Sequence, residues 1–338
     1  MRTALRFGRC CLAIAYLAAT QVGAAEGPVW PSSPAVTRIE YVRAFSRAED
    51  LGIAKGFFAR LKDFVFGEAE TRLVRPMAVV AGDGVIHVAD PGAGGVHRFD
   101  TKAGDYRLIP GPGGSPLPSP VGLARGADGE VYVTDSKLGQ VFVIGRNAHE
   151  AAALRLDTPL RQPTGIAFDA PGRRLFVADT AQHHVVVFGS GGRMIARIGH
   201  RGQADGEFNY PTYLCLASDG TLYVTDSLNF RLQAFDARGG FVSGFGRQGD
   251  SAGDAARQKG VATDHHGHIY VVDALFHAFQ IFDPGGHLLL AVGARGQDRG
   301  EFWLPTGIFI DTGDGDTIYV ADSYNRRVQV LRYVGGPG

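Results

Sequence analysis

Histidine and aspartate side chains gather at two places where they could bind a metal ion. His265, His266 and His268 fall within four residues, and the segment 311–316 (DTGDGD) alternates carboxylates with small residues. Imidazole is a good ligand for zinc, copper or nickel, whereas carboxylates suit calcium or magnesium. The second segment lacks the glycine and glutamate spacing of an EF-hand loop, so we interpret it as a plain turn. For the histidines we expect a solvated turn, with an adventitious metal site as the alternative, and we assign no catalytic residue and no metal ligand.

Carboxylates also recur along the chain at regular intervals. Six strand-like segments end in aspartate and follow one another every 44 to 49 residues. The segments are IHVAD, VYVTD, LFVAD, LYVTD, IYVVD and IYVAD, and they end at Asp90, Asp135, Asp179, Asp226, Asp273 and Asp322. A catalytic site brings unlike groups together once, whereas a scaffold needs the same turn in every repeat. We therefore expect these aspartates to bind backbone N–H groups within turns.

The repeat around each aspartate predicts the fold. A segment such as Pro163-Thr164-Gly165 opens an apolar strand, a hairpin leads to the strand that ends in aspartate, and two further strands follow. These openings fall near Pro76, Pro120, Pro163, Pro211, Gln258 and Pro305. Four short strands in about 45 residues are typical of one propeller blade, and the 48 glycines and 17 prolines of the chain mark its corners. We predict an all-β fold: a six-bladed β-propeller of four-stranded blades over residues 75–333.

The residues before the first repeat are expected to complete the ring. The last repeat lacks a fourth strand, and residues 38–46, which contain the alternating sequence RIEYVRAF, could supply it and leave no open sheet edge. Residues 26–37 would form an extended arm. In residues 50–74 apolar side chains recur at helical spacing, which predicts a short amphipathic helix or linker before the first blade. This helix would pack on the propeller, or alternatively residues 50–67 would contact a membrane surface or a partner.

The N-terminal residues 1–25 have the features of a signal peptide. Arg2, Arg6 and Arg9 precede a short apolar run, and Gly23-Ala24-Ala25 offers small residues for cleavage near Ala25. We therefore expect a periplasmic or secreted protein without a transmembrane segment. Three of the 34 basic residues and none of the 34 acidic ones lie in this segment, so the remainder carries a net charge of −3, which argues against nucleic acid as a partner. Only Cys215 remains after cleavage, so no internal disulfide can form.

Two repeats carry a more specific motif. The segments Asp226-Ser227-Leu228-Asn229-Phe230-Arg231 and Asp322-Ser323-Tyr324-Asn325-Arg326-Arg327 resemble the Asp-Ser-x-Asn-x-Arg signature of NHL-repeat β-propellers. Asn229, Arg231, Asn325 and Arg327 would join the aspartates in structural turns, with each arginine tying adjacent turns together. The resemblance covers roughly residues 75–333 and points to an exported bacterial propeller. The remaining repeats keep the aspartate but lack the asparagine and arginine.

The resemblance also allows one enzymatic function to be tested against the sequence. The peptidyl-hydroxyglycine lyase of peptide amidation is a similar propeller, whose zinc ion is held by three histidines from different blades. His277 stands where one of them is expected, but residues 208–212 (FNYPT) and 302–306 (FWLPT) contain no histidine at the other two positions. A single histidine cannot build such a zinc site.

Departures from the repeat suggest a binding surface instead. Blades three to six place aromatic, histidine and lysine side chains at loops that a rigid scaffold would carry on one face. The candidate partner-binding residues are His183, Tyr210, Tyr213, Phe230, Lys259, Phe276, His277, Trp303 and Tyr324. Aromatic side chains favour contacts with a protein or peptide, although these residues could also pack only between adjacent loops. We expect a non-catalytic binding module without a cofactor, as a component of an envelope complex. The alternative is a lyase-like or lactonase-like enzyme with a metal in the central channel.

Overall fold

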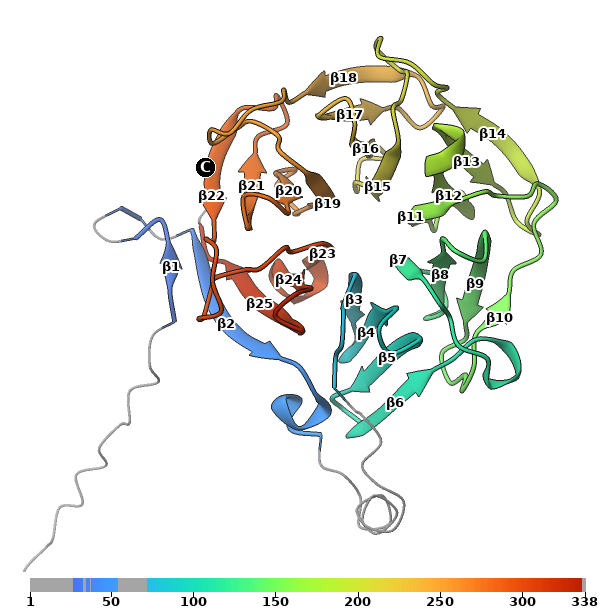
Figure 1. The fold of residues 1–338 in the computed structure, drawn as a ribbon, viewed down its shortest axis with the longest axis horizontal. Coiled ribbons are helices and arrows are strands. Elements are labelled where there is room, and N and C mark those ends of the chain that lie inside the picture. The colour runs from blue at the N-terminus through green and yellow to red at the C-terminus, as the bar shows by residue number, and fades with distance from the viewer. Residues whose placement is uncertain (1–26, 33–34, 37, 54–71, 336–338) are drawn as a thin grey trace, which may run out of the picture.

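Six antiparallel sheets surround a central axis in the computed structural model, which describes residues 27–32, 35–36, 38–53 and 72–335 (Figure 1). Each sheet is one blade, and the chain passes from the innermost to the outermost strand of a blade before it enters the next. The predicted all-β, six-bladed propeller of four-stranded blades is therefore confirmed. Among the described residues, no helix is long and apolar enough to cross a membrane.

The strands follow the repeat closely. Blade one contains β3 (Ala78–Gly82), β4 (Val85–Asp90), β5 (Gly95–Asp100) and β6 (Asp105–Ile109); blade two contains β7 (Pro120–Arg125), β8 (Val131–Asp135), β9 (Gln140–Ile144) and β10 (Ala152–Ala153); blade three contains β11 (Pro163–Asp169), β12 (Arg174–Asp179), β13 (His184–Phe188) and β14 (Met194–Ile198). Blade four contains β15 (Pro211–Leu216), β16 (Leu222–Asp226), β17 (Arg231–Phe235) and β18 (Phe241–Phe245); blade five contains β19 (Gln258–Thr263), β20 (Ile269–Asp273), β21 (Ala278–Phe282) and β22 (Leu288–Val292). Blade six contains β23 (Ile308–Asp311), β24 (Thr317–Asp322) and β25 (Arg327–Tyr333). Short 3-10 helices are η1 (Ala48–Leu51), η2 (Pro112–Gly114), η3 (Thr180–Gln182) and η4 (Thr312–Asp314).

Strand register defines two faces of the propeller. In blade four, Pro211 at the start of β15 pairs with Asp226 at the end of β16, and Asp226 also pairs with Arg231 at the start of β17. The loops that lead into each first strand and the turns after the aspartates therefore share one face, which we call the upper face. The hairpins between the first and second strands lie on the opposite, lower face.

The ring is closed by a segment from the beginning of the chain. Strand β2 (Ile39–Phe45) pairs antiparallel with β25 and supplies the fourth strand of blade six, as Figure 1 shows in blue beside red. A bulge between Tyr41 and Arg43 interrupts the register. Strand β1 (Val29–Trp30) adds a fifth strand outside β2. Most of the predicted helix at 50–74 and the signal peptide at 1–25 lie outside the described residues.

The first strands of neighbouring blades approach one another closely at their upper ends. A Cβ atom at Gly165 would lie 2.5 Å from the carbonyl oxygen of Thr212 in the next blade, and one at Gly307 would lie 2.6 Å from that of Met77. A side chain at either position would therefore collide with backbone that cannot easily move. The hydrophobic core lies between blades rather than within one sheet: Phe208, in the loop between blades three and four, is fully buried with residues of both.

Candidate functional site

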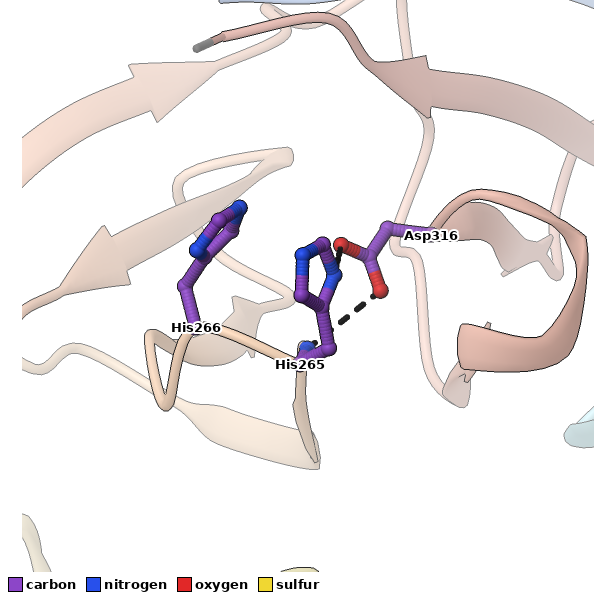
Figure 2. Close-up of side chains that lie close together, drawn as sticks. All are labelled: His265, His266 and Asp316. Carbon is purple, nitrogen blue, oxygen red and sulfur yellow. Dashed lines mark hydrogen bonds and ion pairs between the residues drawn. The ribbon is translucent and has the colours of Figure 1, made fainter. Parts of the chain in front are cut away.

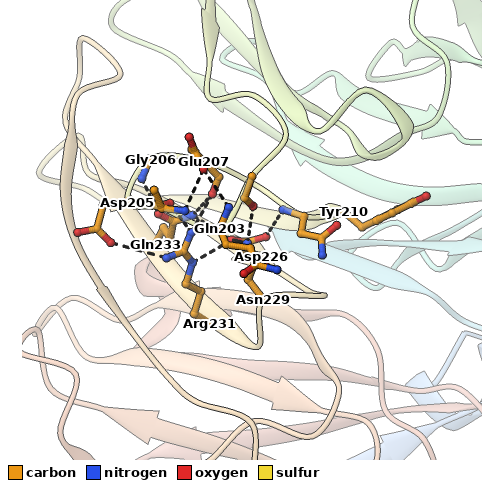
Figure 3. Close-up of polar contacts among 12 residues, drawn as sticks. Gln203, Asp205, Gly206, Glu207, Tyr210, Asp226, Asn229, Arg231 and Gln233 are labelled. Atoms are coloured by element: carbon orange, nitrogen blue, oxygen red, sulfur yellow. Dashed lines mark hydrogen bonds and ion pairs between the residues drawn. The ribbon is translucent and has the colours of Figure 1, made fainter.

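The motif Asp-Ser-x-Asn-x-Arg forms one hydrogen-bonded network on the upper face of blade four (Figure 3). Asp226 accepts hydrogen bonds from Asn229 Nδ2 (2.7 Å), Arg231 Nε (3.0 Å) and Gln233 Nε2 (3.1 Å), and from the backbone N–H of Asn209. Arg231 also donates to the carbonyl oxygens of Ala204 and Glu207 in the preceding loop. The network therefore joins the turn after β16 to the loop that leads into β15.

Blade six repeats this network residue for residue. Asp322 accepts from Asn325 (2.9 Å), Arg327 (2.8 Å) and Gln329 (3.1 Å), and its other oxygen accepts from the backbone N–H of Trp303. Burial raises the pKa of Asp226 and of Asp322 overall, although these hydrogen bonds and the arginines offset part of the rise. In the other four blades Asp90, Asp135, Asp179 and Asp273 are equally buried and bind backbone N–H groups. All six carboxylates are thus occupied by protein groups.

Two histidines from the predicted binding set connect neighbouring blades. His183 Nδ1 accepts a hydrogen bond from the backbone N–H of Tyr210 (3.2 Å), and His277 Nδ1 accepts one from Leu304 (3.1 Å). Both bonds run from the turn of one blade to the loop that opens the next. Burial and the nearby Arg295 lower the pKa of His277, which keeps the accepting nitrogen unprotonated. The Tyr210 ring also packs edge-on against His183, with 4.5 Å between the ring centroids.

Apolar side chains are exposed on the upper face of blades four to six. Leu228 and Leu275, each 52% exposed, occupy the second position after the repeat aspartate in blades four and five, and Tyr324, 59% exposed, holds it in blade six. Tyr210 is exposed beside them, and Tyr324 packs against Trp303 with 6.0 Å between centroids. Phe230 and Phe276, in the same turns, are half-buried. We call the set Tyr210, Leu228, Phe230, Leu275, Phe276, Trp303 and Tyr324 the upper-face arc.

Comparison with known families agrees with this geometry. The NHL repeat model matches residues 160–188 and 208–235, which include the second and third strands of blade three and the complete motif of blade four. This chain carries NHL repeats. No curated protein matches its sequence.

Solved structures of low sequence identity share the NHL propeller's fold. Virginiamycin B lyase from Staphylococcus aureus superposes with a TM-score of 0.57 at 16% identity, over 77% of this chain and 96% of the lyase. An auxiliary nutrient binding protein from Bacteroides thetaiotaomicron gives 0.62 at 12% identity, over 79% and 71% of the two chains. A gluconolactonase-like propeller gives 0.60 at 13% identity, over 86% and 92%. Lyases and a binding protein therefore appear on one architecture.

The central channel of this NHL propeller is a cavity of about 660 Å³ between the first strands of the blades. Glycine, alanine, valine, leucine and aromatic residues line most of it, and the charged lining residues stand at its lower end. These are Arg125, Asp264, His265 and Asp311. Within the described residues, one group of three histidine or carboxylate ligand atoms is close enough to hold a metal ion, namely His265, His266 and Asp316 on the lower face.

One member of the predicted binding set, Tyr213, belongs to the channel, and another, Lys259, is partly buried at the start of β19. Tyr213 lines the cavity and packs against the core between blades four and five, and its burial raises the pKa of its hydroxyl. Lys259 follows Gln258, which pairs with Asp273 at the upper end of blade five, and burial lowers its pKa. The sequence reasoning missed Leu228 and Leu275. Their shared position, two residues after the aspartate, was the signal that could have identified them.

Proposed function

We propose that this NHL propeller is an exported, non-catalytic module that holds a protein or peptide on the upper-face arc, within a complex of the cell envelope. The observation that carries the proposal is the exposure of Leu228, Leu275 and Tyr324 at one repeat position in three successive blades. Exposed apolar side chains gathered on one face are typical of interaction sites, whereas single ones scattered over a surface need no explanation.

The scaffold beneath the arc suits such a role. The buried networks of Asp226 and Asp322 fix the turns that carry Leu228 and Tyr324. His183 and His277 fix the loops between blades, because each accepts a hydrogen bond from a backbone N–H of the next blade. A surface that is already ordered loses little conformational entropy on binding, so more of the contact energy contributes to affinity. Aromatic anchors with polar tips, such as Tyr210 and Tyr324, are also enriched at the centres of protein interfaces.

An enzyme with a metal in the central channel is the competing function, and the resemblance of the fold to lyases is what favours it. Such a site needs several ligands on the channel wall. The described wall is largely apolar, and its histidine and carboxylates stand at the lower end. The ligand chemistry of the channel therefore supports the binding module better.

Affinity purification from the source cells tests the proposal. The tagged full-length chain is compared with a double variant, Leu228→Asp with Leu275→Asp, and with a matched control, Ile195→Asp with Val242→Asp. The control residues are equally exposed apolar side chains, but they lie on the outer strands β14 and β18. We expect wild type and control to recover the same envelope protein, and the arc variant to recover at least about tenfold less of it.

Binding of the identified partner to the purified chains should then show the same order in solution. Recovery that is equal for the arc variant and for wild type would refute the upper face as the binding surface. A loss in the control as large as that in the arc variant would refute it as well, because the effect would then follow from added charge alone.

A further inference from the structure

A second site lies on the lower face, opposite the upper-face arc. His265 and His266 belong to the hairpin between β19 and β20 of blade five, and Asp316 belongs to the hairpin between β23 and β24 of blade six (Figure 2). One ligand atom from each residue lies within 4.8 Å of the other two. We propose that these three residues form a binding site for a divalent transition-metal ion of the zinc type, which would link blades five and six.

The carboxylate of this cluster is held in place. Asp316 is 1% exposed, accepts a hydrogen bond from the backbone N–H of His265 (3.3 Å), and contacts His265 Nδ1. Its backbone adopts a left-handed conformation (φ 53°), which non-glycine residues seldom adopt. The hairpin thus keeps a buried acid directed at the neighbouring blade, where it contacts His265.

The histidine hairpin is fixed by a second buried acid. Asp264 accepts hydrogen bonds from the backbone N–H groups of His266 and His268 (2.9 Å each), from the His268 ring (2.7 Å) and from the Tyr270 hydroxyl (3.0 Å). His268 is therefore engaged with Asp264 and is not among the proposed ligands. The backbone that carries His265 and His266 is ordered before any ion binds, which favours tight binding.

The position of the His266 ring is not explained by the ion pair between His265 and Asp316 alone. Its ring centroid lies 3.8 Å from that of His265, and it also lies near the rings of His268 and Tyr333. Among the described residues, the hydrogen bond that His266 forms comes from its backbone N–H, while its ring makes contacts with other rings. The contact of His265 with Asp316 needs no second imidazole, whereas a metal ion does.

The donor set indicates which ion would bind. Two imidazoles and one carboxylate suit zinc, copper or nickel, and do not suit calcium or magnesium, which prefer oxygen ligands. Ligand atoms bound to one zinc ion in tetrahedral geometry lie roughly 3.4 Å apart, so small side-chain rotations suffice here. Both histidines are exposed, which gives the ion a path to the site. Three protein ligands would leave a coordination position for water or a small anion.

Titration calorimetry with zinc chloride, on the full chain without a histidine tag, tests the proposal. His266→Ala removes an exposed ligand, and Asp316→Asn removes the charge while it keeps a residue that tolerates the left-handed conformation. The matched control is His287→Ala, because His287 is also exposed in a blade-five turn and paired with an aspartate, Asp283 (3.0 Å). We expect one zinc ion per chain in wild type and control, and affinity at least about tenfold weaker in both ligand variants.

Thermal unfolding with and without zinc supplies an independent readout. The ion should raise the melting temperature of wild type and of His287→Ala, and should do so much less in His266→Ala. Circular dichroism without metal would establish that each variant is folded. Unchanged affinity in His266→Ala, or an equal loss in His287→Ala, would overturn the site, since binding would then come from exposed histidines in general.

Discussion

At the scale of single residues, one buried carboxylate recurs in every blade with different partners. In blades four and six Asp226 and Asp322 meet an arginine, whereas in blade one Asp90 lies 3.5 Å from His97. Burial raises the pKa of Asp90, but the nearby His97 and hydrogen bonds from the backbone N–H groups of Val74 and Arg75 lower it overall. In blades four and six the partner of the aspartate is therefore an arginine, whose guanidinium stays charged at any physiological pH.

The first prediction concerns this arginine. Arg231→Ala would leave Asp226, which has no exposure, without its charged partner and would also free two carbonyl oxygens of the preceding loop. Removal of one partner of a buried ion pair costs about 3 kcal/mol, and we expect a loss of that size in the free energy of unfolding. Urea denaturation followed by circular dichroism measures it.

A surface arginine provides the control. Arg332 lies 3.7 Å from Glu40, and both side chains are partly exposed to solvent, so Arg332→Ala should cost less than about 1 kcal/mol. Equal losses for the two variants would show that the network of Asp226 contributes no more than a surface pair.

Residue types in the sequence predicted these turns only in part. Aspartate, asparagine and arginine stood out because they recur at fixed positions, but Gln233 and Gln329 did not, since glutamine within an alternating strand resembles an ordinary exposed residue. Both glutamines are fully buried and complete the networks. The roles of His183 and His277 could not be read from the sequence either, because each holds a backbone N–H group of the following blade.

At the scale of elements, β2 has the largest effect on the stability of the ring, because it pairs with β25 and closes it. Ile39 on this strand is fully buried in the core between blades five and six, whereas Val42 lies at the bulge and is 39% exposed. The alternation of residues 38–46 made this strand visible in the sequence. Strand β1 was not visible, because two residues carry no periodicity. Its Trp30 packs where a side chain at Gly300 would otherwise lie.

The second prediction compares these two residues of β2. Ile39→Ala leaves a cavity in a closely packed core and should lower the free energy of unfolding by about 3 kcal/mol. Val42→Ala removes an exposed side chain and should change it by less than about 1 kcal/mol. Thermal and urea unfolding of both variants measure the difference. Similar values for the two would mean that β2 contributes little to the stability of the ring.

At the scale of the whole molecule, each of the six blades packs against the blade on either side of it. Hydrophobic clusters span neighbouring blades, and one of them joins blade six and the closing strand to blade one through Phe45 and Phe99. Each of the described hydrophobic clusters contains buried residues from two neighbouring blades. We therefore expect a substitution in the closing strand to increase opening at the central channel. The channel wall is built from the first strands, at the opposite edge of each blade from the closing strand.

Cys215 allows this coupling to be measured. It lies on β15 in the channel wall, where burial raises the pKa of its thiol to about 11, and its sulfur lies 3.9 Å from the Thr263 hydroxyl. Thiolate is the reactive form, and this higher pKa lowers the thiolate fraction at pH 8 on the order of 100-fold. We predict that iodoacetamide modifies Cys215 more slowly in the folded chain than in urea, by roughly that factor, as followed by mass spectrometry of its peptide.

The same assay should respond to the ring closure. Ile39→Ala weakens the contact between β2 and β25, so the ring opens more often and the Cys215 peptide should be modified faster than in wild type, whereas Val42→Ala should leave the rate unchanged. Because Ile39 and Cys215 lie on different blades, a local effect of the substitution cannot account for the increase. A rate in Ile39→Ala equal to that of Val42→Ala, with the stability loss present, would show instead that blade six opens without disturbing the channel.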